Sequence, residues 1–345
     1  MSTCNSALVE LIRCKISNDG PVSFAWFMEQ ALYHPEHGYY SSDRAAIGRR
    51  GDYFTNVSVG PLFGELLATQ FVEIWERLGK IDNVVLVEQG AHHGEFAQDV
   101  LESTQRRFPD FFSALRYQII EPFPTLQDRQ SQTLQQFRDR VQWRKSLDAL
   151  GPFVGVHFSN ELLDAMPINL RGKLVGVDGD KFVFVKDAAS APTNQAMLDW
   201  IDCVSTKLQR GFVIAVDYGF ARAEFSEVLQ VRAKHRRLDS PLEEIGEADI
   251  TAHVNWTDLA ERAEPNGLRV AGFTDQHHFL TGIISESPAL FEKAEAKTKR
   301  ELQTLLHPEM LGRTFQVLAL TKDVDLSAPL SGFKFARNPH EALGL

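Results

Sequence analysis

The segment from Val84 to Phe96 limits the possible folds of this chain more than any other stretch. A β-branched apolar run ends on Glu88 and enters a turn that contains Gly90, His92 and Gly94. Apolar residues then recur at helical spacing, which predicts a strand, a tight turn and a helix. In parallel α/β sheets such a turn brings backbone N–H groups to a nucleotide, and glycine is needed where a Cβ would block that approach. A turn required only by the local fold has the same pattern, so nucleotide binding stays open at this point.

A second predicted strand, RYQIIE, ends on Glu121. An acidic residue at this place can accept hydrogen bonds from both ribose hydroxyls of a nucleotide. Dinucleotide-binding proteins carry the acid about 20 residues after the first glycine. Asp110 stands at that spacing but in a predicted loop, whereas Glu121 comes later and ends a strand. The longer spacing favours a methyltransferase over a nicotinamide-dependent oxidoreductase. A solvated carboxylate at the strand end is the alternative interpretation of Glu121.

Five further segments have the composition of strands, and helical patterns separate them. They are 141–144, 153–158, 212–217, 268–273 and 314–320. This alternation predicts a doubly wound, seven-stranded α/β sheet of the Rossmann-like type. Another alternating stretch, Lys173 to Lys186, surrounds Asp178-Gly179-Asp180 and predicts a β-hairpin outside the main sheet.

Apolar spacing predicts two helices near the beginning of the chain, the second over 24–33 with Ser23 as its cap. The segment 34–65 is rich in glycine, serine and aromatic residues, and such long irregular loops are usually functional. Further on, Pro109 lies in a predicted loop, and the polar stretch 221–246 has weak structural signals.

The length of 345 residues suits one large α/β domain with insertions. Four parts are expected. They are N-terminal helices with a covering loop over 1–80, a Rossmann-like nucleotide-binding core over 81–220 with a hairpin inserted at 168–188, an insertion with the remaining core elements over 221–325, and a C-terminal tail over 326–345.

Composition narrows the class of protein. The net charge of -10 argues against general nucleic-acid binding, which relies on clusters of Lys and Arg, and it is compatible with a cationic substrate. Three cysteines without CxxC spacing indicate a reducing compartment. The first residues lack the features of a signal peptide, and no apolar run of about 18 residues occurs. We therefore expect a cytoplasmic protein that does not enter membranes.

Short stretches in a fixed order over nearly the whole chain match one known family. They are GYY (38–40), IGRRGDYFTNVSVGPLFGE (47–65), NELLDAMP (160–167), VDYG (216–219), ADITAHVNWTDL (248–259), QHHFLTGI (276–283) and HPEMLGRTFQVLALT (307–321). In these stretches the chain resembles the MidA-like S-adenosylmethionine-dependent methyltransferases, which include the mitochondrial complex I assembly factor that methylates a protein arginine. The resemblance implies a class I methyltransferase fold with S-adenosyl-L-methionine as cofactor.

The glycine turn departs from the pattern of the family it resembles. The family usually has an acidic residue, a leucine and three alternating glycines, whereas this chain has EQGAHHG over 88–94, with His92 in place of the middle glycine. The imidazole must therefore point away from the cofactor or contact it. The resemblance also implies a loop over the cofactor, in which Asp52 or Thr55 holds its amino-acid end. The alternative interpretation is that both are ordinary turn residues. The expected cofactor-binding residues are Glu88, Gly90, His92, Gly94, Glu121, Gly51, Asp52 and Thr55.

Methyl transfer from a sulfonium is an in-line displacement, so the protein must mainly align the nucleophile with the methyl group. No metal ion is required, and no metal site is expected. The guanidinium of arginine stays protonated, and carboxylates can bind two of its N–H groups while orienting the third nitrogen. Glu161 and Asp164 are the expected catalytic carboxylates, with Asn160 orienting the substrate or the cofactor amine. Helix capping is the alternative for Asn160 and Asp164.

The sequence thus predicts a methyltransferase with a protein arginine as the expected acceptor. Measuring whether the purified protein binds the cofactor tests this prediction. Two alternatives stay open. One is a small-molecule N- or O-methyltransferase, and the other is a non-catalytic assembly factor that keeps the fold. The oligomeric state and the identity of the acceptor do not follow from the sequence.

Overall fold

A computed structural model describes residues 5–41, 55–187, 193–224, 228–234, 236–286 and 295–345 of the chain. Two compact units make up the chain, and each is built from three separated segments. The larger unit comprises Phe54–Leu162, Trp200–Phe225 and Val254–Leu345, and the smaller unit comprises Met1–Tyr53, Leu163–Asp199 and Ser226–His253.

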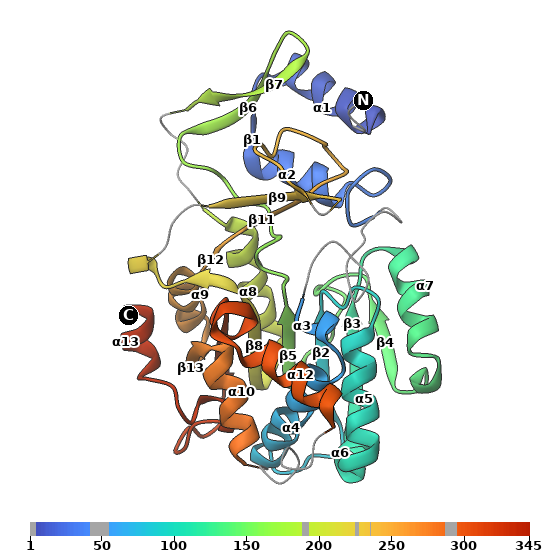
Figure 1. Ribbon diagram of the computed structural model, residues 1–345, viewed down its shortest axis with the longest axis vertical. Helices are drawn as coiled ribbons and strands as arrows, with labels where there is room; N and C mark the ends of the chain where they lie inside the picture. The colour runs from blue at the N-terminus through green and yellow to red at the C-terminus, as the bar shows by residue number, and fades with distance from the viewer. Residues whose placement is uncertain (1–4, 42–54, 188–192, 225–227, 235, 287–294) are drawn as a thin grey trace. The chain divides into compact units, whose positions relative to one another are not determined.

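Within the described residues, the larger unit contains an eight-stranded, mostly parallel sheet (Figure 1). Its order is β13-β14-β8-β5-β2-β3-β4, with β12 beside β8. Strands β8, β5, β2, β3 and β4 run parallel, and β14 is antiparallel to both of its neighbours. All seven predicted strands are confirmed, and β12 is an addition. The strands are β2 (Val84–Gln89), β3 (Leu115–Ile120), β4 (Val141–Arg144), β5 (Phe153–Asn160), β8 (Leu208–Phe220), β12 (Val254–Asn255), β13 (Arg269–Asp275) and β14 (Phe315–Lys322).

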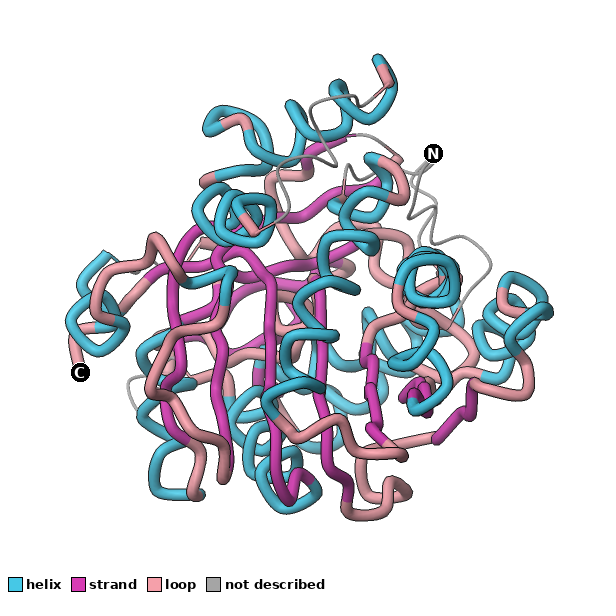
Figure 2. The backbone as a smooth tube through the Cα atoms, turned by 90° about the horizontal axis from the view of Figure 1, so that it is seen from below, coloured by secondary structure: helices cyan, strands magenta, loops and turns pink. Residues whose placement is uncertain are grey.

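Helices cover both faces of this sheet, as Figure 2 shows. On β5, Phe158 packs against Phe71 and Phe96 of two helices, whereas the neighbouring His157 packs against Trp200 of another helix. Successive strand residues point to opposite faces, so the two contacts confirm the doubly wound architecture. The helices are α3 (Asn56–Val59), α4 (Leu62–Arg77), α5 (Glu95–Arg107), α6 (Pro109–Ala114), α7 (Pro124–Thr133), α8 (Gln195–Lys207), α9 (Trp256–Ala263), α10 (Gln276–Ser285), α12 (Ala296–Leu306) and α13 (Pro339–Leu343), with short helical turns at Gln135–Phe137, Arg222–Glu224, Glu264–Asn266, Pro308–Gly312 and Ser331–Phe333.

The imidazole of His157 is fully buried, and neither ring nitrogen has a hydrogen-bond partner among the described residues. Burial lowers the pKa of His157 to about 3. The folded state therefore keeps this ring neutral. Between the usual pKa of 6.5 and the lowered value of about 3, the unfolded chain binds the proton and the folded chain does not.

We expect this difference to lower the free energy of unfolding by about 2 kcal/mol between pH 7 and pH 5. His157→Leu removes the titrating group and should lose correspondingly less stability over this range. Urea unfolding of both proteins at the two pH values measures the effect. Equal losses for the two proteins would show that His157 does not make the fold sensitive to acid.

Among its described residues, the smaller unit combines two complete helices with two short antiparallel sheets. In its described part the sheets have the orders β1-β6-β7 and β10-β9-β11. Ser23 accepts a hydrogen bond from the Trp26 N–H and caps α2, as predicted, and the predicted hairpin is confirmed as β6 and β7. The elements are α1 (Ser6–Asp19), α2 (Phe24–Tyr33), β1 (Val22–Ser23), β6 (Lys173–Asp178), β7 (Lys181–Lys186), β9 (Leu229–Ala233), β10 (Arg236–Arg237) and β11 (Asp249–Ala252).

One structural prediction was wrong, and one strand lies where the sequence has only weak structural signals. The segment after Pro109 is helix α6, in which proline takes the first position, where its missing N–H costs no hydrogen bond. The polar stretch 221–246 contains strand β9, whose Val231 and Ala233 are buried. Charged neighbours such as Arg232 hide the alternation of this strand, because the strand is too short for a clear pattern.

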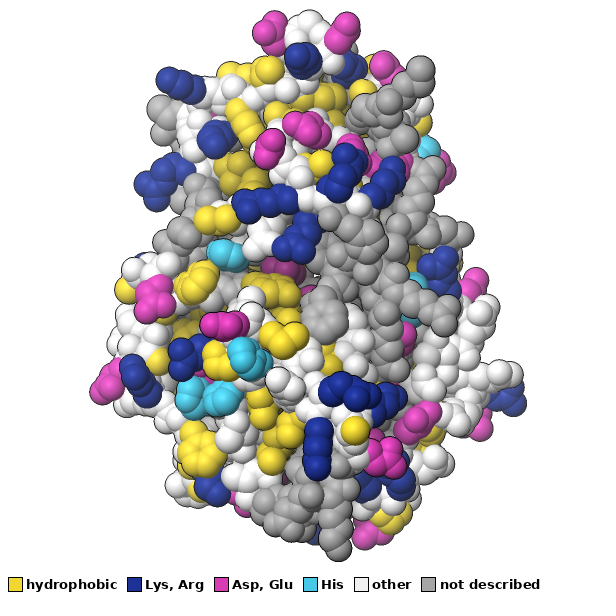
Figure 3. Space-filling model, in the orientation of Figure 1, with side chains coloured by type: hydrophobic (Ala, Val, Ile, Leu, Met, Phe, Trp, Pro, Cys, Tyr) yellow, Lys and Arg dark blue, Asp and Glu magenta, His cyan; other side chains and the backbone are white. Residues whose placement is uncertain are grey.

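On the surface, Lys and Arg side chains are interspersed with Asp and Glu over the face in Figure 3. The formal net charge is -10. In the part of the chain that the structure describes, no helix has both the length and the apolar character needed to span a bilayer.

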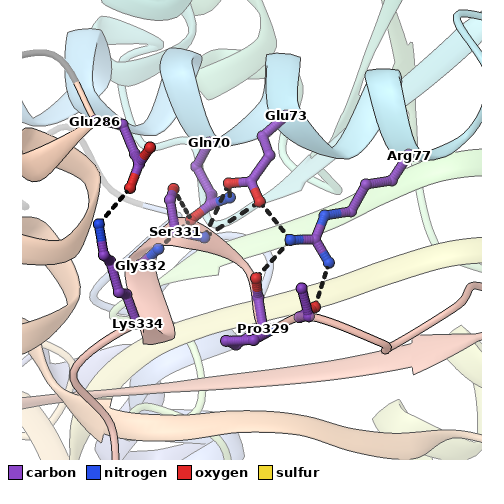
Figure 4. A network of polar contacts seen from close by, with 9 residues as sticks. Gln70, Glu73, Arg77, Glu286, Pro329, Ser331, Gly332 and Lys334 are labelled. Atoms are coloured by element: carbon purple, nitrogen blue, oxygen red, sulfur yellow. Dashed lines mark hydrogen bonds and ion pairs between the residues drawn. The ribbon is translucent and has the colours of Figure 1, made fainter.

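The C-terminal part of the chain is bound to helix α4 by a polar network (Figure 4). Gln70 Oε1 accepts a hydrogen bond from the Gly332 N–H at 2.9 Å, and Glu73 Oε2 accepts one from the Ser331 N–H at 3.0 Å. Arg77 binds Glu73 at 2.7 Å and donates to the carbonyl of Ala328 at 2.6 Å. These contacts order the segment after β14 against the helix layer of the larger unit.

Candidate functional site

The carboxyl ends of β2, β3 and β5 lie side by side. The last residue of β2 pairs with the last residue of β3 and with Ser159, the penultimate residue of β5. Gly90, Glu121 and Asn160 therefore stand at neighbouring strand ends, on the edge of the sheet where parallel α/β proteins bind nucleotides. A Cβ added to Gly90 would lie 3.8 Å from the Asn160 carbonyl oxygen, which places the turn beside the end of β5.

The turn after β2 uses three residues with positive φ. These are Gly90 at 85°, His92 at 47° and Gly94 at 82°. The Gly94 N–H donates to the Ala91 carbonyl at 2.7 Å, which closes the turn before α5 begins. A left-handed backbone is uncommon for a residue with a side chain. The imidazole of His92 packs against that of His93, with ring centroids 3.7 Å apart and ring planes tilted by 30°.

Gln130 of α7 joins the turn to Glu121. Its Nε2 donates to the His92 carbonyl at 2.8 Å and to Glu121 Oε2 at 2.9 Å, while Trp143 Nε1 donates to its Oε1 at 2.9 Å. Gln130 is fully buried. Sequence reasoning missed this residue, because α7 is polar almost throughout and glutamines that face inward and outward look the same.

Glu121 and Glu88 are buried carboxyl groups. Burial raises the pKa of Glu121 to about 7, although hydrogen bonds from the Phe123 N–H and Gln130 favour the ionised form. Burial likewise raises the pKa of Glu88 to about 7, against the effect of the Tyr117 hydroxyl, which donates to Oε2 at 2.6 Å. Glu88 thus bonds to the neighbouring strand, whereas Glu121 stands at the strand end.

The segment after β5 holds two of the predicted catalytic residues together. Asn56 Nδ2 donates to Asn160 Oδ1 at 3.0 Å, and Asn160 Nδ2 donates to Glu161 Oε1 at 2.9 Å. The backbone of Glu161 has φ of 53°, and its N–H donates to the Val216 carbonyl at 3.0 Å. Strained backbones of this kind concentrate at functional sites.

Asp217 fixes the end of β8 to this segment. Its Oδ2 accepts from the Leu162 N–H at 3.0 Å, and its Oδ1 accepts from the Tyr218 N–H at 2.8 Å. Only 1% of the surface of Asp217 is exposed, so this buried carboxylate has a structural role near the end of β8.

Asp164, the other predicted carboxylate, belongs to the smaller unit, whereas Asn160 and Glu161 belong to the larger. Its side chain is buried. Nearby, the Tyr40 hydroxyl donates to Asp249 Oδ1 at 2.8 Å, and burial followed by the charges of Asp249, Tyr33 and Asp164 raises the pKa of Tyr40. Asp164 therefore lies in a buried polar cluster of the smaller unit.

The loop predicted to cover the cofactor is described only from Thr55 onward. Gly51 and Asp52 lie outside the described residues. Thr55 caps α3 through a reciprocal capping box with Ser58, and the two hydroxyl oxygens are 2.7 Å apart. The Thr55 side chain thus has a structural partner in addition to its predicted cofactor contact.

These features together suit an adenosyl group. The exposed Gly90 offers backbone without a side chain, and Glu121 presents a carboxylate at the next strand end, where ribose hydroxyls would need acceptors. In the described residues, no group of three or more His, Cys, Asp and Glu side chains is arranged to hold a metal ion.

Comparisons with known proteins agree with this geometry. The profile of the family described as "Putative S-adenosyl-L-methionine-dependent methyltransferase" matches residues 66–181 and 185–274. The protein arginine methyltransferase NDUFAF7 of Homo sapiens is 25% identical, covering 95% of this chain and 85% of that protein. Its homolog from Drosophila melanogaster is 24% identical, covering 92% and 85%. A crystal structure from Burkholderia thailandensis, bound to S-adenosyl-homocysteine, superimposes with a TM-score of 0.86 at 27% identity, covering 97% of this chain and 96% of that one.

The sheet order, the glycine turn and the acidic strand ends define a class I S-adenosylmethionine-dependent methyltransferase. The cofactor predicted from the resemblance is thereby confirmed. The chain belongs to the MidA-like family of S-adenosyl-L-methionine-dependent methyltransferases.

Proposed function

We propose that this methyltransferase acts on the guanidinium of an arginine in a protein. The observation that carries the proposal is the Glu161 carboxylate, which Asn160 orients at the end of β5 beside the glycine turn. The NDUFAF7 relatives are named protein arginine methyltransferases and align over nearly the whole chain. A net charge of -10 is compatible with a cationic acceptor.

In this proposal the turn and Glu121 hold the methyl donor. The backbone at Gly90 and Gly94 lies close to the ligand, while the ionised Glu121 accepts hydrogen bonds from the ribose hydroxyls. Gln130 fixes the Glu121 carboxylate and the turn in one geometry. S-adenosylmethionine supplies an electrophilic methyl group on sulfur when bound.

Glu161 binds two N–H groups of the guanidinium and directs the remaining nitrogen toward the methyl group. Charge-assisted hydrogen bonds of this kind are about twice as strong as neutral ones. As the nitrogen gains the methyl group it releases a proton, and the sulfur keeps the electron pair of the broken bond. The carboxylate of Glu161 can accept that proton before it passes to water. The predicted catalytic role of Asp164 stays a prediction, because this carboxylate belongs to the buried polar cluster of the smaller unit.

Radiolabelled S-adenosylmethionine tests whether the methyl acceptor is a protein arginine. We expect purified enzyme and radiolabelled S-adenosylmethionine to label protein in a cell extract, with methylarginine recovered after acid hydrolysis. Peptides made from the labelled region should accept methyl groups, whereas the same peptides with Arg→Lys should not. Label confined to the low-mass fraction would instead identify a small-molecule acceptor, and no label in either fraction would indicate a non-catalytic role.

We propose the cytoplasm as the compartment. Cys14 and Cys203 are free thiols in the described chain, as expected in a reducing environment. The vertebrate relatives are named as mitochondrial proteins. Fractionation of cells that express the tagged chain separates the two compartments, and recovery with mitochondria would contradict the proposal.

A further inference from the structure

Asn56 is a fully buried side chain with one unused hydrogen-bonding atom. Its Nδ2 donates to Asn160 Oδ1, but its Oδ1 has no hydrogen-bond partner within the described chain. The capping box of Thr55 and Ser58 fixes the backbone on either side. A buried acceptor without a donor costs stability, so its presence beside the predicted site needs an explanation.

The orientation of both amides follows from Glu161. A carboxylate only accepts hydrogen bonds, so Asn160 must present Nδ2 to Glu161. Asn160 then presents Oδ1 to Asn56, and Asn56 must donate a hydrogen bond to it from its own Nδ2. Turning either amide over would place two acceptors together. The unpaired atom is therefore the oxygen of Asn56, which is free to accept a hydrogen bond from an N–H or O–H group of a ligand.

The neighbouring charge selects the chemistry of that ligand. The Glu161 carboxylate stands at the other end of this short chain of amides, which favours a positive group over a neutral one. The bound ligands of a methyltransferase offer two cationic nitrogens. They are the ammonium in the methionine portion of the donor and, resting on the proposed function, the guanidinium of the acceptor.

We propose that Asn56 Oδ1 accepts a hydrogen bond from a cationic nitrogen of the bound donor or acceptor. Asn56 is then a ligand-binding residue through Oδ1 and a positioning residue for Glu161 through Nδ2. The unpaired acceptor of the free protein is satisfied on binding, so part of the cost present before binding is recovered as affinity.

Asn56→Leu tests the proposal, because leucine has a similar volume and no polar side-chain atom. Calorimetry should use S-adenosyl-homocysteine and, as a matched ligand, methylthioadenosine, which lacks the amino-acid portion. If the ammonium is the partner, the variant should bind S-adenosyl-homocysteine about 10-fold more weakly with methylthioadenosine unchanged. If the guanidinium is the partner, both affinities should persist and the KM of an arginine acceptor should rise about 10-fold.

Two outcomes would overturn the proposal. One is no change in either affinity or in KM, and the other is equal weakening of both nucleosides, which would indicate general damage. Asn56→Ala repeats the test without added volume if the leucine variant fails to fold. If the chain methylated no arginine, only the guanidinium alternative would be removed. Calorimetry would still decide whether the ammonium of the donor is the partner of Asn56.

Discussion

Replacing Glu161 with glutamine is expected to lower kcat/KM for an arginine acceptor by about 1000-fold, while the affinity for S-adenosyl-homocysteine changes less than about threefold. The variant keeps the size of the side chain and one carbonyl oxygen. It removes the negative charge that, in the proposed function, binds the guanidinium and accepts its proton, and it disturbs the hydrogen bond from Asn160. Steady-state kinetics with labelled donor and calorimetry with the product measure the two effects.

A matched control is Glu10→Gln, which makes the same chemical change on the exposed surface of α1. This control should retain the parent kcat/KM. Full activity in Glu161→Gln would remove Glu161 from the mechanism. Parallel losses of activity and of product affinity would show instead that Glu161 supports the cofactor pocket.

Replacing Glu121 with glutamine is expected to weaken binding of S-adenosyl-homocysteine by about 100-fold at pH 8, because the two charge-assisted hydrogen bonds proposed between Glu121 and the ribose hydroxyls would be lost or weakened. The parent affinity should itself depend on pH. The pKa of Glu121 is about 7, so the accepting carboxylate is present above this value and is lost as the pH falls through it. Calorimetry should therefore show an affinity about tenfold lower at pH 6 than at pH 8.

Glu88→Gln distinguishes the two buried carboxyl groups that share this pKa. The pH dependence of affinity should persist in Glu88→Gln, since Glu88 is bonded to Tyr117, and should disappear in Glu121→Gln. His93 also lies nearby, but burial and then the charge of Arg129 lower its pKa. Pronounced pH dependence in the Glu121→Gln variant would assign the titration to another group.

Much of the architecture could be predicted because it depends on short-range patterns. The run ending on Glu88 and the run ending on Glu121 are apolar and β-branched, and both are strands that finish close to the predicted residues. Ser23 caps α2 because its side chain reaches an N–H three residues away. Where the pattern was short and polar, as in β9, the same reasoning gave only weak signals and did not predict the strand.

The candidate site could be predicted only in part. Glycines after a first strand and an acid after a second one lie at recognisable positions, so Gly90 and Glu121 could be named without coordinates. Gln130 and Asn56 could not, since each is an ordinary polar residue whose importance comes from its burial and its partners. His92 was recognised as unusual, but its packing against His93 needed the structure.

By itself, the sequence determined most of the segments that become strands and helices, the α/β class and the methyltransferase family, because spacing, capping and ordered motifs are properties of neighbours along the chain. The tertiary structure decided the order of strands across the sheet, the grouping of distant segments into two units and the partners of Glu88, Glu121 and Glu161. Asn56 and Asn160 are 104 positions apart, yet they share a hydrogen bond. Contacts of this kind depend on packing and desolvation over the whole fold, which no local pattern encodes.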